Sequence, residues 1–154
     1  MLSPQILNIE PIEVLCVRHI GAYSKCTPAW DKLMHFAYAN NLITKSTRAF
    51  GIGYDNPHLV DESQLRYDAC ITKETNPNLE DGIKATTING GKYATFLHNG
   101  SYETLCDTYN YIFGVWIVEN WITLRYTPPF EEYLNNPQTT QPDELRTLIY
   151  LPIT

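Results

Sequence analysis

The sequence predicts an α+β protein in which one small βαββ unit is duplicated about an approximate two-fold axis. Two patterns in the 154-residue chain recur at nearly one offset. The residues H-I-G-A-Y at 19–23 return 79 positions later as H-N-G-S-Y, and D-N-P at 55–57 returns 80 positions later as N-N-P. We therefore expect two copies, about 12–74 and 91–153, that form an antiparallel sheet with two helices and a ligand cleft between the halves.

The first copy has the pattern strand, helix, strand, strand. Residues 13–19 are apolar and β-prone, which indicates a strand. Thr27-Pro28 is typical of a helix start, with a hydroxyl cap before the proline, and apolar residues then recur at spacings of three and four as far as Asn40. A glycine-interrupted strand is expected at 48–54, and a third strand at 66–73 after a proline turn.

The second copy repeats this order after a polar linker, which we place at 75–90. Its expected elements are a strand at 92–98, a helix from about Tyr102 to Glu119 capped by Ser101, β-prone segments at 123–126 and 130–134, and a closing strand at 145–151. Pro128-Pro129 separates the two β-prone segments, and prolines in a sheet are confined to edges and bulges.

Length and composition favour one globular domain over residues 1–154. The hydrophobic fraction is 44%, and no apolar run approaches the ~18 residues of a membrane span. The first residues lack the basic and apolar regions of a secretory signal, so we expect a cytoplasmic protein. The net charge of −6 argues against direct nucleic-acid binding, which depends on Lys and Arg.

Cysteine and histidine give no sign of a metal or a cofactor. The four cysteines form no C-x-x-C pair, and we interpret them as reduced, mostly buried residues. His35 and His58 have no companions at metal-ligand spacing. His19 and His98 occupy matching strand ends before a glycine, so we interpret them as structural residues that hydrogen-bond the turn.

Two adjacent acids break the symmetry of the copies. At an offset of 79, Tyr54 aligns with Tyr133, and Glu131-Glu132 aligns with isoleucine and glycine. Because adjacent strand residues face opposite ways, one of the two acids should point inward. A bulge with both acids in solvent remains the alternative at this stage.

Aromatic residues are the second asymmetry. The expected second helix and the residues after it are rich in tyrosine, phenylalanine and tryptophan, and the chain has 11 tyrosines. Such residues at helical spacing often form a core. A buried phenol must find a hydrogen-bond partner, however, which favours the wall of a cavity for flat apolar molecules. A carboxylate among such rings would favour a lipophilic cation and should have a raised pKa.

Several motifs carry a family resemblance that covers about residues 14–153. The second copy contains H-x-G-x-Y-E-T-L at 98–105, P-F-E-E-Y-L-N-N-P at 129–137 and E-L-R-T-L-I-Y-L-P at 144–152. The first copy contains G-Y-D-N-P at 53–57 and L-R-Y-D-A-C-I at 65–71. Together these motifs closely resemble the GyrI-like small-molecule-binding domain, which is also the effector-binding domain of AraC-type and MerR-type multidrug-sensing regulators.

The resemblance implies a pair of βαββ units with a hydrophobic cleft between them. In the family's sensors, an acid in the F-E-x-Y stretch meets cationic aromatic drugs. By position, that acid is Glu131, with Tyr133 two residues on. Tyr67, Tyr109 and Trp116 match further family cleft positions. Most sensors also carry a DNA-binding domain, for which the sequence leaves no room ahead of the first copy, so we expect a protein that resembles the free-standing members.

Three functions follow from the resemblance. We favour a non-enzymatic module that binds cationic, lipophilic aromatic compounds without a cofactor or metal. Some GyrI-like proteins hydrolyse cyclopropane-bearing DNA alkylators, and here Glu131 would be the general acid or base. A third function is a modulator that binds DNA gyrase or a regulator as its protein partner. The natural ligand and a homodimer state stay open.

Overall fold

We describe the protein from a computed structural model that covers residues 3–154. The first copy comprises β1 (Gln5–Ile9), β2 (Ile12–Ile20), α1 (Thr27–Ala39), β3 (Ala49–Gly53) and β4 (Arg66–Thr72). The second comprises β5 (Lys84–Ile88), β6 (Gly91–Asn99), α2 (Leu105–Tyr111), α3 (Ile117–Glu119), β7 (Phe130–Tyr133) and β8 (Arg146–Pro152). The α+β class and the duplication are confirmed.

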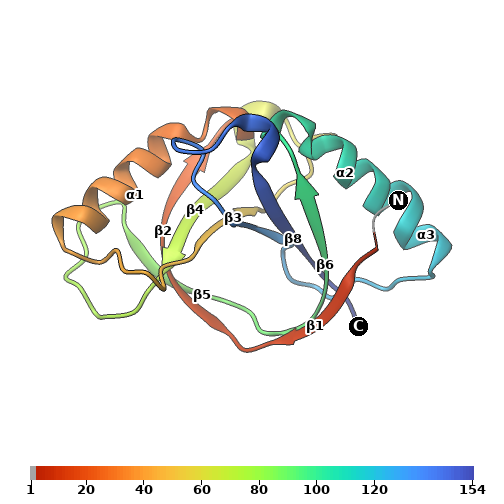
Figure 1. Cartoon of the computed structure of the whole chain (residues 1–154), viewed down its shortest axis with the longest axis horizontal. Helices are drawn as coiled ribbons and strands as arrows, with labels where there is room; N and C mark the ends of the chain where they lie inside the picture. Colours follow the sequence, from red (N-terminus) through yellow and green to blue (C-terminus); the bar gives the residue numbers. More distant parts are fainter. Residues whose placement is uncertain (1–2) are drawn as a thin grey trace.

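All eight strands form one antiparallel sheet in the order β1-β6-β8-β7-β3-β4-β2-β5. The two halves meet where β3 pairs with β7, at the centre of the sheet. In Figure 1, α1 covers one half and α2–α3 covers the other, with the central strands between them. The meeting line of the two halves therefore lies below the gap between the helix ribbons.

Each copy has one strand more than the sequence predicted. β1 precedes the first unit and pairs with β6 of the second, whereas β5 pairs with β2 of the first. The copies thus exchange their first strands. The expected linker at 75–90 was wrong in this respect, because it contains β5. The β5 strand (K-A-T-T-I) is exposed at four of its five positions, so it lacks the apolar pattern that marks a strand.

The second helix contains one residue more than the first. Asn40 ends α1 and Asn120 ends α3, and each side-chain amide donates to the carbonyl four residues earlier. These residues are 80 positions apart, whereas His19 and His98 are 79 apart. A π-helical turn at Ile112–Trp116 joins α2 to α3 and accommodates the extra residue.

The extra residue corrects the alignment of the two copies. Beyond the π-helical turn the offset is 80, so Tyr133 corresponds to Gly53 and Glu131 corresponds to Gly51. The sheet register agrees, since Gly53 faces Tyr67 while Tyr133 faces Thr147. The alignment of Tyr54 with Tyr133 was therefore wrong by one residue.

Smaller differences concern the helix starts and one strand. Ser101 caps a short 3-10 helix, Tyr102–Thr104, that leads into α2, by accepting from the backbone N–H of Glu103 at 3.2 Å; α2 itself begins at Leu105 and has no side-chain cap bond. Thr27 is the first helical residue rather than the cap, and α1 has no side-chain cap bond. The segment 123–126 makes only a single bridge, between Leu124 and Ile153.

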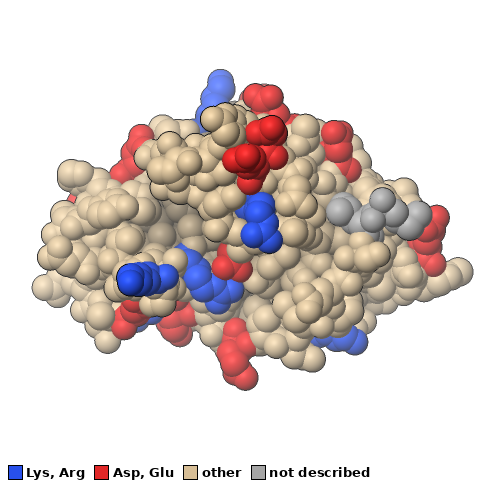
Figure 2. Space-filling view, in the orientation of Figure 1, with Lys and Arg blue, Asp and Glu red and all other residues tan. Residues whose placement is uncertain are grey.

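The core has three parts. One lies under α1 and one under α2, and the third fills the opposite face of the sheet around Phe50, Phe130 and Tyr150. In Figure 2, the Lys and Arg side chains of the described residues lie singly or in pairs on the visible face, among scattered Asp and Glu. Among the helices of residues 3–154, none has the length and apolar character that a membrane span requires.

Candidate functional site

The adjacent acids of β7 lie on opposite faces of the sheet. Glu132 is buried on the face away from the helices, where it forms a bidentate ion pair with Arg48 at 2.8 and 3.0 Å. The Tyr150 hydroxyl also donates to Glu132 at 2.8 Å. Glu131 faces the helices, which follows from the alternation of strand residues. The two acids therefore point to opposite faces, as predicted: Glu132 is paired with Arg48 in the core, and Glu131 faces the helices.

Glu131 lies at the centre of the sheet, half-buried, and its carboxylate is held by two phenols. The Tyr109 hydroxyl, from α2, donates to Oε2 at 2.6 Å, and the Tyr133 hydroxyl, from β7, donates to Oε1 at 2.9 Å. Burial raises the pKa of Glu131 above its ordinary value, although these two hydrogen bonds reduce the shift. None of the ion pairs within residues 3–154 includes Glu131. It is a sheltered acid without a counter-ion.

A directed chain of hydrogen bonds reaches Glu131 from the other half. The Trp30 indole N–H, on α1, donates to the Tyr67 hydroxyl at 3.2 Å, and the hydroxyls of Tyr67 and Tyr133 are 2.7 Å apart. Because Tyr133 gives its one proton to Glu131, Tyr67 must donate to Tyr133. Burial raises the pKa of Tyr67 and Tyr133, which keeps both phenols protonated.

Further rings pack around this chain. Trp30 and Tyr102 each meet the Tyr133 ring in an edge-on arrangement, at centroid distances of 5.7 and 5.6 Å. Tyr23 lies against the Tyr67 ring at 5.9 Å. We call the set Tyr23, Tyr67, Tyr102, Tyr109 and Tyr133 the tyrosine cluster. It gives Glu131 an aromatic surround to which both halves contribute.

The aromatic residues around Glu131 recur in both halves, but the acid occurs in only one. Under the corrected alignment, Tyr23 corresponds to Tyr102 and Trp30 corresponds to Tyr109. The counterpart of Glu131 is Gly51, and a Cβ atom there would overlap the hydroxyls of Tyr67 and Tyr133. Glycine in one half therefore gives the two phenols the space in which they approach each other.

The structure brings together four of the five predicted site residues: Glu131, Tyr133, Tyr67 and Tyr109. Trp116 is not among them. It is 8% exposed in the core under the second helix, where its ring meets the edge of Phe96 at 5.0 Å. Tyr23 and Trp30 were not identified from the sequence, and Tyr102 was noted only as one of the aromatic residues of the second helix. Their signal was present, because Tyr23 and Trp30 lie 79 positions before aromatic residues of the second copy.

The paired histidines hold the turns that begin each half of the site. His19 Nε2 lies 2.9 Å from the carbonyl of Ala22, and His98 Nε2 lies 3.1 Å from that of Ser101. This agrees with the structural role inferred for both. Within residues 3–154, no group of three or more His, Cys, Asp or Glu side chains is arranged to hold a metal ion.

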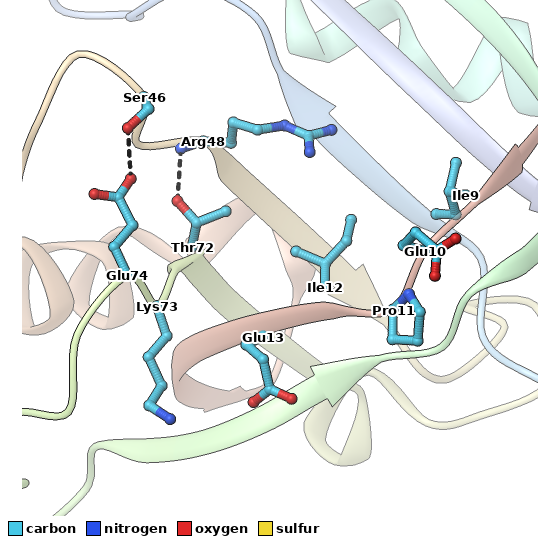
Figure 3. Close-up of a pocket in the computed structure, with 10 residues that line it drawn as sticks. All are labelled: Ile9, Glu10, Pro11, Ile12, Glu13, Ser46, Arg48, Thr72, Lys73 and Glu74. Carbon is cyan, nitrogen blue, oxygen red and sulfur yellow. Dashed lines mark hydrogen bonds between the residues drawn. The ribbon is translucent and has the colours of Figure 1, made fainter.

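A cavity of about 410 Å³ lies apart from Glu131. Residues 9–13, Ser46, Arg48 and residues 72–74 line it (Figure 3). Hydrogen bonds already tie parts of this lining together, from Ser46 to Glu74 and from the Arg48 backbone to Thr72. No residue of the tyrosine cluster contributes to it. The rings around Glu131 instead pack against one another.

Comparison with known proteins shows the family of the chain. The model of the GyrI-like small-molecule-binding domain matches residues 2–154. The chain belongs to the GyrI-like family. Among the curated GyrI-like relatives, the chain is 22% identical to the probable transcriptional regulator YgiV of Escherichia coli K12, over 99% of this chain and 96% of that protein. It is 32% identical to a DNA gyrase inhibitor of Pectobacterium carotovorum, over 70% of this chain and 73% of that protein.

Solved structures share the GyrI-like fold. The EcmrR C-terminal domain has a TM-score of 0.79 at 20% identity, with 100% of this chain and 98% of that domain covered. In an EcmrR–DNA complex, the chain covers only 57% of the longer EcmrR chain, at a TM-score of 0.83 and 20% identity. SAV2435 bound to tetraphenylphosphonium has a TM-score of 0.64 at 13% identity, with 99% and 94% covered. A protein of Listeria innocua described as a hydrolase has a TM-score of 0.70 at 13% identity, with 99% and 92% covered.

Proposed function

We propose that this GyrI-like domain binds cationic, lipophilic aromatic compounds between its halves, with Glu131 as the counter-charge. The observation that carries the proposal is the carboxylate itself. Glu131 is sheltered among aromatic rings, and phenols rather than a Lys or Arg side chain hold it. Its neighbour Glu132, by contrast, has Arg48 as a partner. An unpaired sheltered acid is a receptor for a positive charge that arrives from outside.

The aromatic rings would supply the remaining attraction. A cation over the face of an aromatic ring gains roughly 0.5–2 kcal/mol per contact. The desolvation cost of the carboxylate is offset when a cation reaches it. The Tyr133 phenol can keep its hydrogen bond to Glu131 while its ring meets a ligand that has no N–H group. Tetraphenylphosphonium, the ligand of the structural neighbour SAV2435, is such a cation and supports this choice of probe.

The rings around Glu131 must separate to admit a ligand of this size. Phe113, 44% exposed, lies next to Tyr109 in a stacked arrangement at 6.4 Å on the outer side of the second helix. Tyr109 is thus the cluster member that adjoins an exposed ring. We propose that movement of Tyr109 and its helix opens the site.

Titration with tetraphenylphosphonium tests the proposal. In Glu131→Gln, the shape is kept and the charge is removed, so we expect affinity to fall at least about tenfold, which corresponds to about 1.4 kcal/mol. Glu119→Gln, an exposed acid on α3, is the matched control and should bind like the wild type. Equal affinity of Glu131→Gln and the wild type would contradict the proposal.

A hydrolase is the second candidate, because a structural neighbour is described as one and burial raises the pKa of Glu131. A carboxyl group whose pKa approaches the operating pH can transfer protons. Glu131 would then act as general acid or base, with Tyr67 positioning the substrate ring. Incubation with a cyclopropane-bearing alkylator, followed by detection of ring-opened product, separates catalysis from binding. Product formation that survives Glu131→Gln would exclude this role for the acid.

A protein partner is the third candidate, and it rests on the name of a relative, the DNA gyrase inhibitor. A supercoiling assay with purified gyrase, with and without the protein, tests it. Unchanged supercoiling at a large excess of the protein would remove gyrase as the partner.

A further inference from the structure

One buried hydroxyl beside the site has no hydrogen-bond partner among residues 3–154. Thr147 lies on β8 with its side chain fully buried, and its Oγ1 makes no hydrogen bond to any described residue. Leaving a buried hydroxyl unpaired costs about 1–3 kcal/mol, so such groups in native proteins call for a partner. The neighbouring polar groups indicate where this partner lies.

Thr147 is on the same face of the sheet as Glu131. β8 pairs with β7 on one side and with β6 on the other, and Thr147 stands opposite Tyr133 and opposite His98. Residues directly opposite each other in a sheet point to the same face. Glu131 stands opposite Ile149, so it is the diagonal neighbour of Thr147, about 7–8 Å away across the strands.

The duplication explains why a small residue occupies this position. Thr147 corresponds to Tyr67 in the first half, and the Tyr67 phenol lies over Gly51. In the second half, the residue at the place of Gly51 is Glu131, whose side chain takes up the volume above the strand. A tyrosine at 147 would compete with Glu131 for this volume, whereas threonine leaves the acid its space.

Other groups do not serve as the partner of Thr147. Both ring nitrogens of His98 are engaged, Nδ1 with Thr108 at 2.7 Å and Nε2 with Ser101 and Thr104 at 3.1 Å. Tyr133 gives its proton to Glu131. Two hydrogen bonds through one water span about 5.5 Å, which suits a diagonal pair with one long, flexible side chain.

We propose that Thr147 is a positioning residue that holds one water molecule against the Glu131 carboxylate. The Thr147 hydroxyl donates to the water, and the water donates to Glu131 as its third hydrogen bond. Such a bond favours the charged form of the acid. The proposal rests on the proposed function and deepens it, because Thr147 would help to keep Glu131 in the charged form that binds a cation.

Titration of the Glu131 carboxyl carbon by NMR tests the role of Thr147 without any ligand. Thr147→Val keeps the shape and removes the hydroxyl, and Thr147→Ser keeps the hydroxyl. We expect the valine variant to raise the pKa of Glu131 by roughly half a unit or more, as loss of one hydrogen bond to the charged form does, and the serine variant to stay near the wild type. The other ionisable side chains that interact with Glu131 are those of the tyrosine cluster, Cys26 and His98.

A second possible result of the Thr147→Val titration would overturn the proposal. If Thr147 is simply an unpaired hydroxyl, the valine variant leaves the pKa of Glu131 unchanged within about 0.2 units and raises the melting temperature, because the buried cost disappears. That outcome, or any shift of the pKa below roughly half a unit, overturns the proposal.

A second readout links Thr147 to the proposed function. The pH midpoint of tetraphenylphosphonium binding should move upward in Thr147→Val by the same amount as the pKa of Glu131, with an unchanged plateau at high pH. A loss of affinity at every pH would instead indicate damage to the site and count against a positioning role. The two proposals fail separately, because equal binding by Glu131→Gln contradicts the cation site while the ligand-free titration still decides the role of Thr147.

Discussion

Gly51→Ala places one methyl group where the two halves of the site meet. The new Cβ would overlap the hydroxyls of Tyr67 and Tyr133, which are 2.7 Å apart above Gly51. Neither phenol can retreat freely, because Trp30 donates to Tyr67 and Tyr133 donates to Glu131. The substitution should therefore destabilise the fold and break the chain of hydrogen bonds that reaches Glu131.

The expected magnitude follows from three contributions. Overpacking a filled site costs about 1–3 kcal/mol. Separating Tyr67 from Tyr133 adds about 1 kcal/mol. Alanine recovers about 0.5–1 kcal/mol, because it loses less backbone entropy on folding than glycine does. We therefore expect Gly51→Ala to lower the free energy of unfolding by about 1–3.5 kcal/mol, and the melting temperature by about 2–4 °C for each kcal/mol.

Urea denaturation followed by circular dichroism measures this effect. Gly114→Ala is the control, because a Cβ on Gly114 meets no heavy atom within 4 Å, and alanine favours helix over glycine by up to about 1 kcal/mol. The control should be as stable as the wild type or slightly more stable. A Gly51→Ala protein that matches the control in stability would refute the close approach of the two phenols.

Two further predictions concern the pair of acids. Arg48→Met leaves Glu132 buried without a counter-ion and should lower the free energy of unfolding by about 2–4 kcal/mol. The loss is smaller than for a fully buried ion pair because the Arg48 side chain is 44% exposed. A free energy of unfolding from urea denaturation within about 0.5 kcal/mol of the wild type would contradict this. Glu131 has a folded-state pKa raised above its unfolded value, so the stability it contributes is complete below the unfolded pKa and is lost as pH rises through the folded pKa. Glu131→Gln should therefore gain stability relative to the wild type as pH rises across this window, and a difference that does not change with pH would disprove the raised pKa.

The duplication and the class of the fold could be predicted because turns leave strong local signals. Gly21 and Gly100, two residues after His19 and His98, each have a positive φ of 129°, which other residues rarely adopt, so the sequence repeats at these positions. Glu131 could be singled out because it has no counterpart in the first copy and because the family resemblance points to it. A residue whose chemical type differs between two otherwise similar copies can be identified by comparing the copies.

The missed features depend on contacts between segments far apart in the chain. β1 and β5 are short, mostly exposed edge strands that the other copy stabilises by pairing, and no local apolar pattern marks them. The one-residue shift of the alignment comes from the π-helical turn, for which the sequence has no recognisable pattern. Without that shift, Gly51 could not be matched to Glu131. The sequence therefore did not show that the space the Tyr67 phenol fills above Gly51 in the first half is filled by the Glu131 side chain in the second.

Trp116, which was matched to the site by position, lies apart from the tyrosine cluster. It occupies the turn of the helix where the extra residue is accommodated, and there it packs on Phe96 in the core. Trp30, which contacts Tyr67 and Tyr133 of the tyrosine cluster, lies in the other helix and reaches the site only through the folding of the two halves. Residue type alone could not distinguish these two tryptophans.

The pKa of Glu131, measured with and without tetraphenylphosphonium, tests the central claim most directly. A cation held beside the carboxylate favours the charged form, so saturation with the probe should lower the pKa of Glu131. If the probe binds and the pKa of Glu131 stays where it was, the acid does not receive the cation, and the account of the site is wrong.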